Sequence, residues 1–196
     1  MNIEIRKLAP DLAEKYAHFF DVTPHWDDMS KNELPCYCVT WRSDRSYAGD
    51  GDHWYPTREE RRERAIRFIR DGSLQGYLAY LGDRVVGWCN ATAECKGGVE
   101  HLRSYWPIEE HPADVKVMSI FCFMVAPDAQ RLGVATKLTK RICMDAAADG
   151  YDFVEAYANI EFVAPDCKGP LAMYERCGFI RHSERDGRVV VRKMLK

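Results

Sequence analysis

The chain has 196 residues, enough for one domain with its own hydrophobic core but few for two. Its residues are 46% hydrophobic and 30% charged, with a formal net charge of −2, which favours a globular protein and argues against nucleic acid as a partner. No stretch approaches the ~20 consecutive apolar residues of a membrane span, and the N-terminus mixes charges into every turn, unlike a signal peptide. We therefore expect one cytoplasmic domain that does not associate with membranes.

The first third of the chain predicts a strand followed by two helices. Residues 2–8 alternate as a strand does, and a proline then opens a helix over 10–20. The sequence T-R-E-E is a capping box, in which the Thr57 hydroxyl and the Glu60 carboxylate satisfy the free amides of a helix start. We expect this second helix to stop at 71–72. Its arginines interleave with glutamates at pairing distances, which favours a solvated face over an anion site.

The rest of the chain alternates between strands and helices. The hydrophobic periods predict, in order, strands over 75–81 and 84–94 joined by a tight turn, a strand over 115–126, a helix over 131–148, a strand over 152–158, a short helix over 170–176, and a closing hairpin of strands over 178–185 and 188–195. This order predicts a mixed α/β fold.

Two segments, at about 21–56 and 96–114, show no clear periodicity. They hold four of the five tryptophans, so disorder is the weaker explanation. Long loops in a compact domain are usually functional. We expect these aromatic-rich insertions to form the walls of a pocket.

The most informative segment is SIFCFMVAPDAQRLGVATKL, which predicts a buried strand that runs through a Pro-containing turn into a helix. A helix N-terminus presents free amides and the positive end of the helix dipole to an anion. Gly133 lets the backbone approach that anion closely, and Arg131 adds a cation. The pattern predicts a diphosphate site that is neither a dinucleotide fingerprint nor a Walker loop. An ordinary strand-turn-helix with one glycine is the alternative.

Two motifs resemble the GNAT (Gcn5-related N-acetyltransferase) superfamily. Q-R-L-G-V-A at 130–135 resembles its acyl-CoA motif Q/R-x-x-G-x-G/A, and L-A-M-Y-E-R-C-G-F at 171–179 resembles its A-x-x-Y-x-x-x-G-F segment. The resemblance covers 2–196 apart from the two insertions. It implies a single GNAT domain over 1–196, with a central, mostly antiparallel, twisted sheet of about seven strands, splayed fourth and fifth strands, and helices on both faces. The loop over 160–169 is longer than usual in the family, so the family's pantetheine-binding asparagine is not assigned to Asn159.

The resemblance implies acetyl-CoA as co-substrate and direct attack of a neutral amine on the thioester. A backbone amide of the fourth strand, from Met124 or Val125, would stabilise the developing oxyanion. Tyr174 would protonate the leaving thiolate, although packing of its ring against the CoA helix is the alternative. The residues implied to bind the cofactor are Phe123, Met124, Val125, Gln130, Arg131, Leu132, Gly133, Val134, Ala135 and Thr136.

The sequence offers several candidates for the base that removes the ammonium proton. Glu155 begins a strand beside the implied CoA site, and strand alternation places it on one face with Tyr157. We predict that Glu155 acts through a water molecule. The alternatives, all in the second insertion, are Glu100, His101, Glu110 and His111.

The first insertion contains a C-x-C pair, Cys36 and Cys38. With eight cysteines and no secretory segment, reduced thiols are the default. The sequence shows no second ligand pair at structural zinc spacing, so we expect no metal. Alternation would send both thiols to one side, and we expect Cys36, Cys38 and Trp41 to line the substrate channel, with plain packing as the alternative.

The resemblance implies an N-acetyltransferase that uses acetyl-CoA. The insertions favour a primary amine of a small molecule as acceptor, because long aromatic insertions would enclose a compact substrate. A protein N-terminal or lysine acetyltransferase would need an open groove instead. A non-catalytic acyl-CoA-binding or thiol-sensing module is the alternative from another class. Pairing of exposed strand edges between two copies of the chain would give a homodimer.

Overall fold

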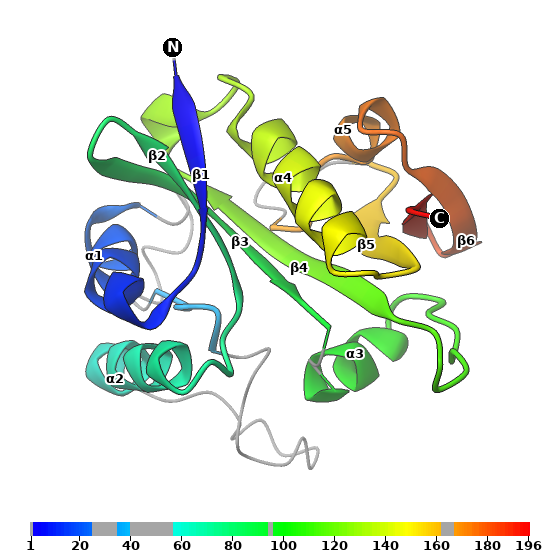
Figure 1. Ribbon diagram of the computed structural model, residues 1–196, viewed down its shortest axis with the longest axis horizontal. Helices are drawn as coiled ribbons and strands as arrows, with labels where there is room; N and C mark the ends of the chain where they lie inside the picture. Colours follow the sequence, from blue (N-terminus) through cyan, green and yellow to red (C-terminus); the bar gives the residue numbers. More distant parts are fainter. Residues whose placement is uncertain (1, 25–34, 40–56, 94–95, 162–166) are drawn as a thin grey trace.

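The computed structural model describes residues 2–24, 35–39, 57–93, 96–161 and 167–196. Its centre is a seven-stranded sheet in the order β1-β2-β3-β4-β5-β7-β6 (Figure 1). Among these strands, β4 and β5 run parallel and every other neighbouring pair runs antiparallel. The strands are β1 Ile3–Lys7, β2 Gly76–Leu81, β3 Arg84–Thr92, β4 Val117–Val125, β5 Phe153–Asn159, β6 Ile180–Arg185 and β7 Arg188–Met194. The predicted mixed α/β fold is confirmed.

Helices cover both faces of the sheet. Neighbouring residues of β3 point to opposite faces. On one face, a Cβ at Gly87 would lie 2.6 Å from Val134 of α4. On the other face, Trp88 packs edge-on against Tyr16 of α1. Figure 1 shows α4 crossing the sheet, with α1 and α2 at the side of strands β1–β3. The helices are α1 Ala13–Val22, α2 Arg58–Arg70, α3 Lys96–Arg103, α4 Val134–Ala148 and α5 Leu171–Arg176.

Local chemistry accounts for most of the helix boundaries. The capping box at Thr57 and Glu60 is present in both directions, and α2 ends at Arg70 with Asp71 as its C-cap, so the predicted stop at 71–72 is confirmed. The first helix begins with a 3-10 turn over Pro10–Leu12, so α1 proper starts three residues later than expected. None of the helices in the described ranges is long and apolar enough to cross a membrane.

Two expectations about helices were wrong. The helix predicted over 131–148 begins only at Val134, because Arg131 and Gly133 adopt φ angles of 62° and 83°, which an α-helix does not accommodate. The second insertion, expected to lack regular structure, contains α3. Leu102 of α3 is buried in a small cluster with Trp106, Phe121, Tyr157 and Val190.

The parallel strands β4 and β5 separate partway along their length. Their register runs from Val117 opposite Phe153 to Ile120 opposite Ala156. Beyond these pairs β4 continues beside β3 and β5 beside β7, which opens the expected splay. The register of β3 and β4 shifts at the same level, leaving Phe121 as an extra residue in β4. We call the space that follows the strand gap; Phe121, Phe123 and Tyr157 mark its edges.

Candidate active site

The N-terminus of α4 is shaped to receive an anion. Gly133 is the N-cap, with φ 83° and ψ 14°, and nothing lies within 4 Å of the position a Cβ would take. The amide of Lys137 donates to the Gly133 oxygen at 3.0 Å, the first bond of the helix. The amides of Val134, Ala135 and Thr136 therefore have no acceptor within the helix, and no side chain caps it. This cradle fits the predicted diphosphate.

Side-chain hydrogen bonds hold the turn that precedes α4 against the sheet. Arg84, at the start of β3, forms two hydrogen bonds with Asp128, of 3.3 and 2.7 Å. The Gln130 side chain donates to the Val125 oxygen at 3.4 Å. Arg131 is exposed, and Leu132 is 40% exposed. The turn thus presents its backbone and Arg131 to solvent.

Val134 and Gly87 fix the distance between α4 and the sheet. Val134 is buried, and its Cγ1 would lie only 2.6 Å from a Cβ at Gly87. Of the predicted cofactor residues, Val134 can therefore offer a ligand only its main chain. The missing side chain of Gly87 lets the helix N-terminus sit close to β3.

The backbone groups of β4 alternate between β3 and the strand gap. The amide of Phe123 donates to the Cys167 oxygen at 2.6 Å, so Phe123 faces the gap. Ala126 donates to Val86 of β3 at 2.9 Å, so it faces the other way. Alternation then turns the amide of Val125 toward the gap and that of Met124 toward β3. Of the two amides expected to stabilise an oxyanion, Val125 has the suitable direction.

Lys168 lies in the strand gap and was missed by sequence reasoning. Its side chain is 6% exposed, and its Nζ donates to the Phe121 oxygen at 2.9 Å. The ammonium also lies 5.2 Å from the centre of the Trp106 ring, within cation–π range. A lysine in a loop ordinarily indicates a solvated side chain, and only the packing of residues 167–168 against β4 reveals its burial.

Tyr174 lies on α5 with its ring buried beside the strand gap. The ring packs edge-on against Phe179 at 5.3 Å and lies 6.2 Å from Phe123. The hydroxyl donates to the main-chain oxygen of Lys168 at 2.7 Å. The structure therefore brings Tyr174, Lys168 and the gap-facing backbone of β4 together, while the general-acid role of Tyr174 stays a prediction.

Glu155 belongs to a buried polar network on β5 and β7. Its carboxylate accepts a hydrogen bond from Arg192 Nε at 2.7 Å and another from the Tyr157 hydroxyl at 3.0 Å, which confirms that Glu155 and Tyr157 share a face. A proton on the carboxylate would neutralise the charge that pairs with Arg192 and weaken this buried ion pair. The general-base role of Glu155 stays a prediction, and this geometry argues against it.

His111 closes the same network from the loop after α3. Its Nε2 lies 3.7 Å from the Glu155 carboxylate and 3.4 Å from Arg192. Burial lowers the pKa of His111, partly offset by Glu155, which raises it. His111 is thus set toward its neutral form in the folded protein. Of the other base candidates, Glu110 is exposed and lies 3.7 Å from Arg103.

The expectation that alternation directs Cys36 and Cys38 was wrong. Residues 36–39 form a tight turn in which Tyr37 and Cys38 have φ angles of 44° and 54°, so strand alternation does not apply. Cys38 is buried in the core, which favours the packing alternative, whereas Cys36 is half-buried. Trp41 lies outside the described residues. Within those residues, no group of three or more ligating side chains is arranged to hold a metal ion.

Comparisons with known proteins agree with this geometry. The model of the acetyltransferase (GNAT) family matches residues 26–179. The GNAT domain of PAT from S. lividans aligns with a TM-score of 0.56 at 18% identity, covering 98% of this chain and 90% of that chain. A GNAT-family acetyltransferase from Streptococcus pneumoniae gives 0.54 at 17% identity, covering 98% and 99%.

A third solved structure, yncA from Salmonella typhimurium with its cofactor acetyl-CoA, gives a TM-score of 0.52 at 13% identity, covering 99% of this chain and 94% of that chain. No curated protein matches the sequence. At these identities the solved structures show the fold alone, whereas the family match extends over most of the chain. The protein therefore belongs to the GNAT family of acetyltransferases.

Proposed function

We propose that this acetyltransferase moves the acetyl group of acetyl-CoA to a primary amine of a small molecule, by direct attack of the neutral amine on the thioester. The observation that supports the proposal is the open, left-handed Gly133 at the start of α4, beside the strand gap. The amides of the first turn of α4 and the Arg131 guanidinium would hold the diphosphate. The gap would receive the pantetheine arm.

Three groups beside the gap would stabilise charge during the reaction. The Val125 amide would donate to the carbonyl oxygen as negative charge develops there. The Tyr174 hydroxyl would turn from the Lys168 oxygen and donate its proton to the departing thiolate. The Lys168 ammonium, held at Phe121, would add a positive charge to a site with little water.

The proposal of a small acceptor rests on composition. The first insertion, over 21–56, joins aromatic residues with several carboxylates, a combination that suits a compact cation. The described part of this insertion is anchored to the core, since Tyr37, Cys38 and Val39 are buried. Residues 37–39 would thereby hold a pocket wall against the core.

Mass spectrometry of reactions containing the protein, acetyl-CoA and an acceptor panel tests the proposal. The panel holds small primary amines, peptides with free N-termini and peptides with internal lysines. We expect one new acetyl group on a small amine. Acetylation of peptides alone would support the protein acetyltransferase instead, and binding of acetyl-CoA without turnover of any acceptor would support the non-catalytic module.

Two glycine variants locate the cofactor. Gly133→Glu places a carboxylate in the cradle and should abolish acetyl-CoA binding measured by calorimetry. Gly72→Glu is the matched control, because Gly72 is also exposed, has φ 76° and has nothing within 4 Å of a Cβ, but lies after α2. Equal acetyl-CoA binding by the two variants would show that the diphosphate does not bind at α4.

A further inference from the structure

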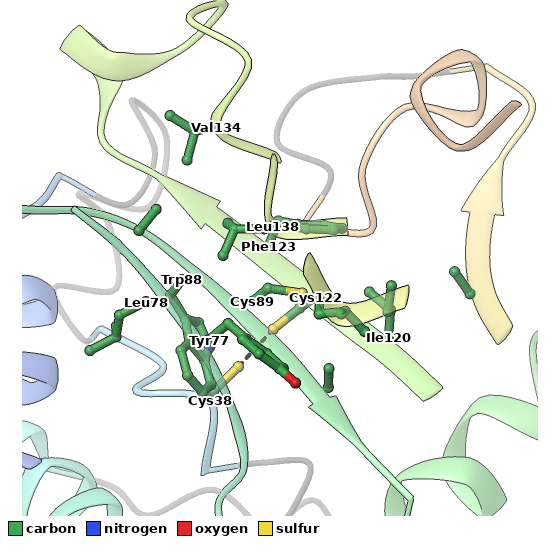
Figure 2. Packing of buried hydrophobic residues seen from close by; sticks show 14 of the residues in the cluster. Cys38, Tyr77, Leu78, Trp88, Cys89, Ile120, Cys122, Phe123, Val134 and Leu138 are labelled. Atoms are coloured by element: carbon green, nitrogen blue, oxygen red, sulfur yellow. Dashed lines mark hydrogen bonds between the residues drawn. The ribbon is translucent and has the colours of Figure 1, made fainter. Parts of the chain in front are cut away.

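Cys38 and Cys122 form a buried thiol pair that the proposed reaction does not use. Their sulfur atoms lie 2.7 Å apart although the residues are 84 positions apart in the sequence (Figure 2). Cys38 is 1% exposed and Cys122 is 5% exposed. The pair joins the turn over 36–39 to β4, next to the strand gap.

The turn that carries Cys38 is held in an unfavourable backbone conformation. Tyr37 and Cys38 both have left-handed φ angles, which non-glycine residues rarely adopt. Helix α1 secures the turn, because the Tyr16 hydroxyl donates to the Tyr37 oxygen at 2.7 Å and the Tyr37 hydroxyl donates to Asp21. The ring of Tyr37 also stacks on Phe20 at 5.4 Å. The position of Cys38 is therefore imposed by its surroundings.

The irregularity in β4 directs Cys122 to the same place. Cys122 lies opposite Asn90, and Met124 lies opposite Trp88, on the α1 face of the sheet. Ser119 lies opposite Thr92 on that face as well, so the extra residue Phe121 has reversed the alternation between Ser119 and Cys122. In a regular strand, Cys122 would point toward α4 and away from Cys38.

Cys36 connects the buried pair to solvent. It is half-buried and lies two residues before Cys38 in the same turn, in which the Val39 amide donates to the Cys36 oxygen at 3.3 Å. Burial raises the pKa of the Cys38 thiol well above its usual value. The hydrogen bond with Cys38 lowers the pKa of Cys122, while burial raises it, and the result lies above the usual value. Both sulfurs are also shielded from solvent, so an oxidant in solution reaches them less readily than it reaches Cys36.

We propose that Cys38 and Cys122 are the site of a reversible disulfide formed with hydrogen peroxide, which enters at Cys36. The Cys36 sulfur attacks the peroxide, the O–O bond breaks, and a sulfenic acid and one water form. The Cys38 sulfur displaces the sulfenic oxygen as a second water and forms an S–S bond to Cys36. The Cys122 sulfur then attacks Cys38, forms the new S–S bond and returns Cys36 as a thiol.

Over the three steps, two thiols and one hydrogen peroxide give one disulfide and two waters. An S–S bond is about 2.05 Å long, so the paired sulfurs need to approach by less than about 1 Å. The cross-link closes a long loop of chain and therefore restricts the unfolded state. We expect it to raise the Tm of the protein by about 5–15 °C.

The experiment treats the folded protein with hydrogen peroxide, removes the oxidant, alkylates the remaining thiols and maps the digest by mass spectrometry. We expect a cross-linked peptide pair containing Cys38 and Cys122, which dithiothreitol separates, together with the rise in Tm. Neither result depends on acetyl transfer. A disulfide that stays between Cys36 and Cys38, or oxidised Cys36 without any link to Cys122, would overturn the proposal.

Single substitutions sharpen the result. Cys38→Ala and Cys122→Ala should each lose both the cross-link and the peroxide-dependent rise in Tm. Cys143→Ala removes a buried thiol of α4 outside the group and should keep both. Cys36→Ser should form the cross-link several-fold more slowly. Cross-linking of Cys36→Ser at the wild-type rate would refute the role of Cys36 as the entry point.

Discussion

The hydroxyl of Tyr174 and the ammonium of Lys168 are tied to each other through the chain, because Tyr174 donates to the main-chain oxygen of Lys168 at 2.7 Å while the side chain of Lys168 reaches back to β4 at 2.9 Å. One short segment thus positions both a proton donor and a positive charge at the strand gap. Each can be removed separately, since the Tyr174 bond uses only the main chain of residue 168.

Tyr174→Phe tests the general acid. Loss of the hydroxyl should reduce the single-turnover rate by about 10²-fold or more, with acetyl-CoA affinity nearly unchanged, because protonation of the thiolate matters only in the transition state. Tyr16→Phe is the matched control, since Tyr16 is equally buried and donates to the Tyr37 oxygen at 2.7 Å. Both variants should lose about 1 kcal/mol of unfolding free energy. Equal rates in the two variants would leave Tyr174 with a packing role.

Lys168→Met tests the buried positive charge. Methionine keeps an apolar side chain of similar length, so we expect a fall in single-turnover rate of about 10²-fold from lost electrostatic stabilisation. Lys193→Met is the control, because Lys193 also donates to a main-chain oxygen, that of Cys177 at 2.8 Å, but lies on β7 behind α5. If both variants retain the wild-type rate, Lys168 serves only to hold the loop against β4.

Glu155→Gln separates a structural role from a catalytic one. The substitution leaves Arg192 in a largely buried position without its close carboxylate, so we expect a loss of about 3–5 kcal/mol of unfolding free energy. The single-turnover rate of the folded variant should stay near that of the wild type. Adding Arg192→Met should recover part of the lost stability. A stable variant with a strongly reduced rate would instead identify Glu155 as the base.

The lowered pKa of His111 predicts a dependence of stability on pH. Unfolded histidine titrates near pH 6.5, so between the lowered native pKa and that value the unfolded chain binds more protons than the folded one. The unfolding free energy should therefore rise with pH through this window and fall as the pH drops below about 6.5. His111→Gln should flatten that part of a Tm-against-pH profile, and His18→Gln, an exposed histidine of α1, should keep the wild-type profile.

Features encoded by neighbouring residues were predictable from the sequence. The capping box of α2 involves residues three apart, and the shared face of Glu155 and Tyr157 follows from strand alternation. Features that depend on distant contacts were not. Helix α3 contains two glycines and is ordered by the packing of Leu102 against Phe121 and Val190. The burial of Lys168 depends on Trp106 and β4, which no local pattern indicates.

The directions of the Cys38 and Cys122 side chains could not be predicted from the sequence either. Strand alternation does not apply to Cys38, because α1 holds residues 36–39 in a left-handed turn. The irregularity at Phe121 changed the direction of Cys122, and nothing in the apolar run of β4 marks the position of an extra residue.

The short pairing of β4 with β5 divides the sheet into two parts of different connectivity. Four residue pairs join strands β1–β4 to the group of β5, β7 and β6, and we call these pairs the seam. Amides along this seam should exchange with deuterium before those inside either part, because a short ladder opens at a lower free energy than a long one. A molecule bound across the seam would slow that exchange on both strands at once. Binding at the site would therefore raise the free energy needed to separate the two parts of the sheet.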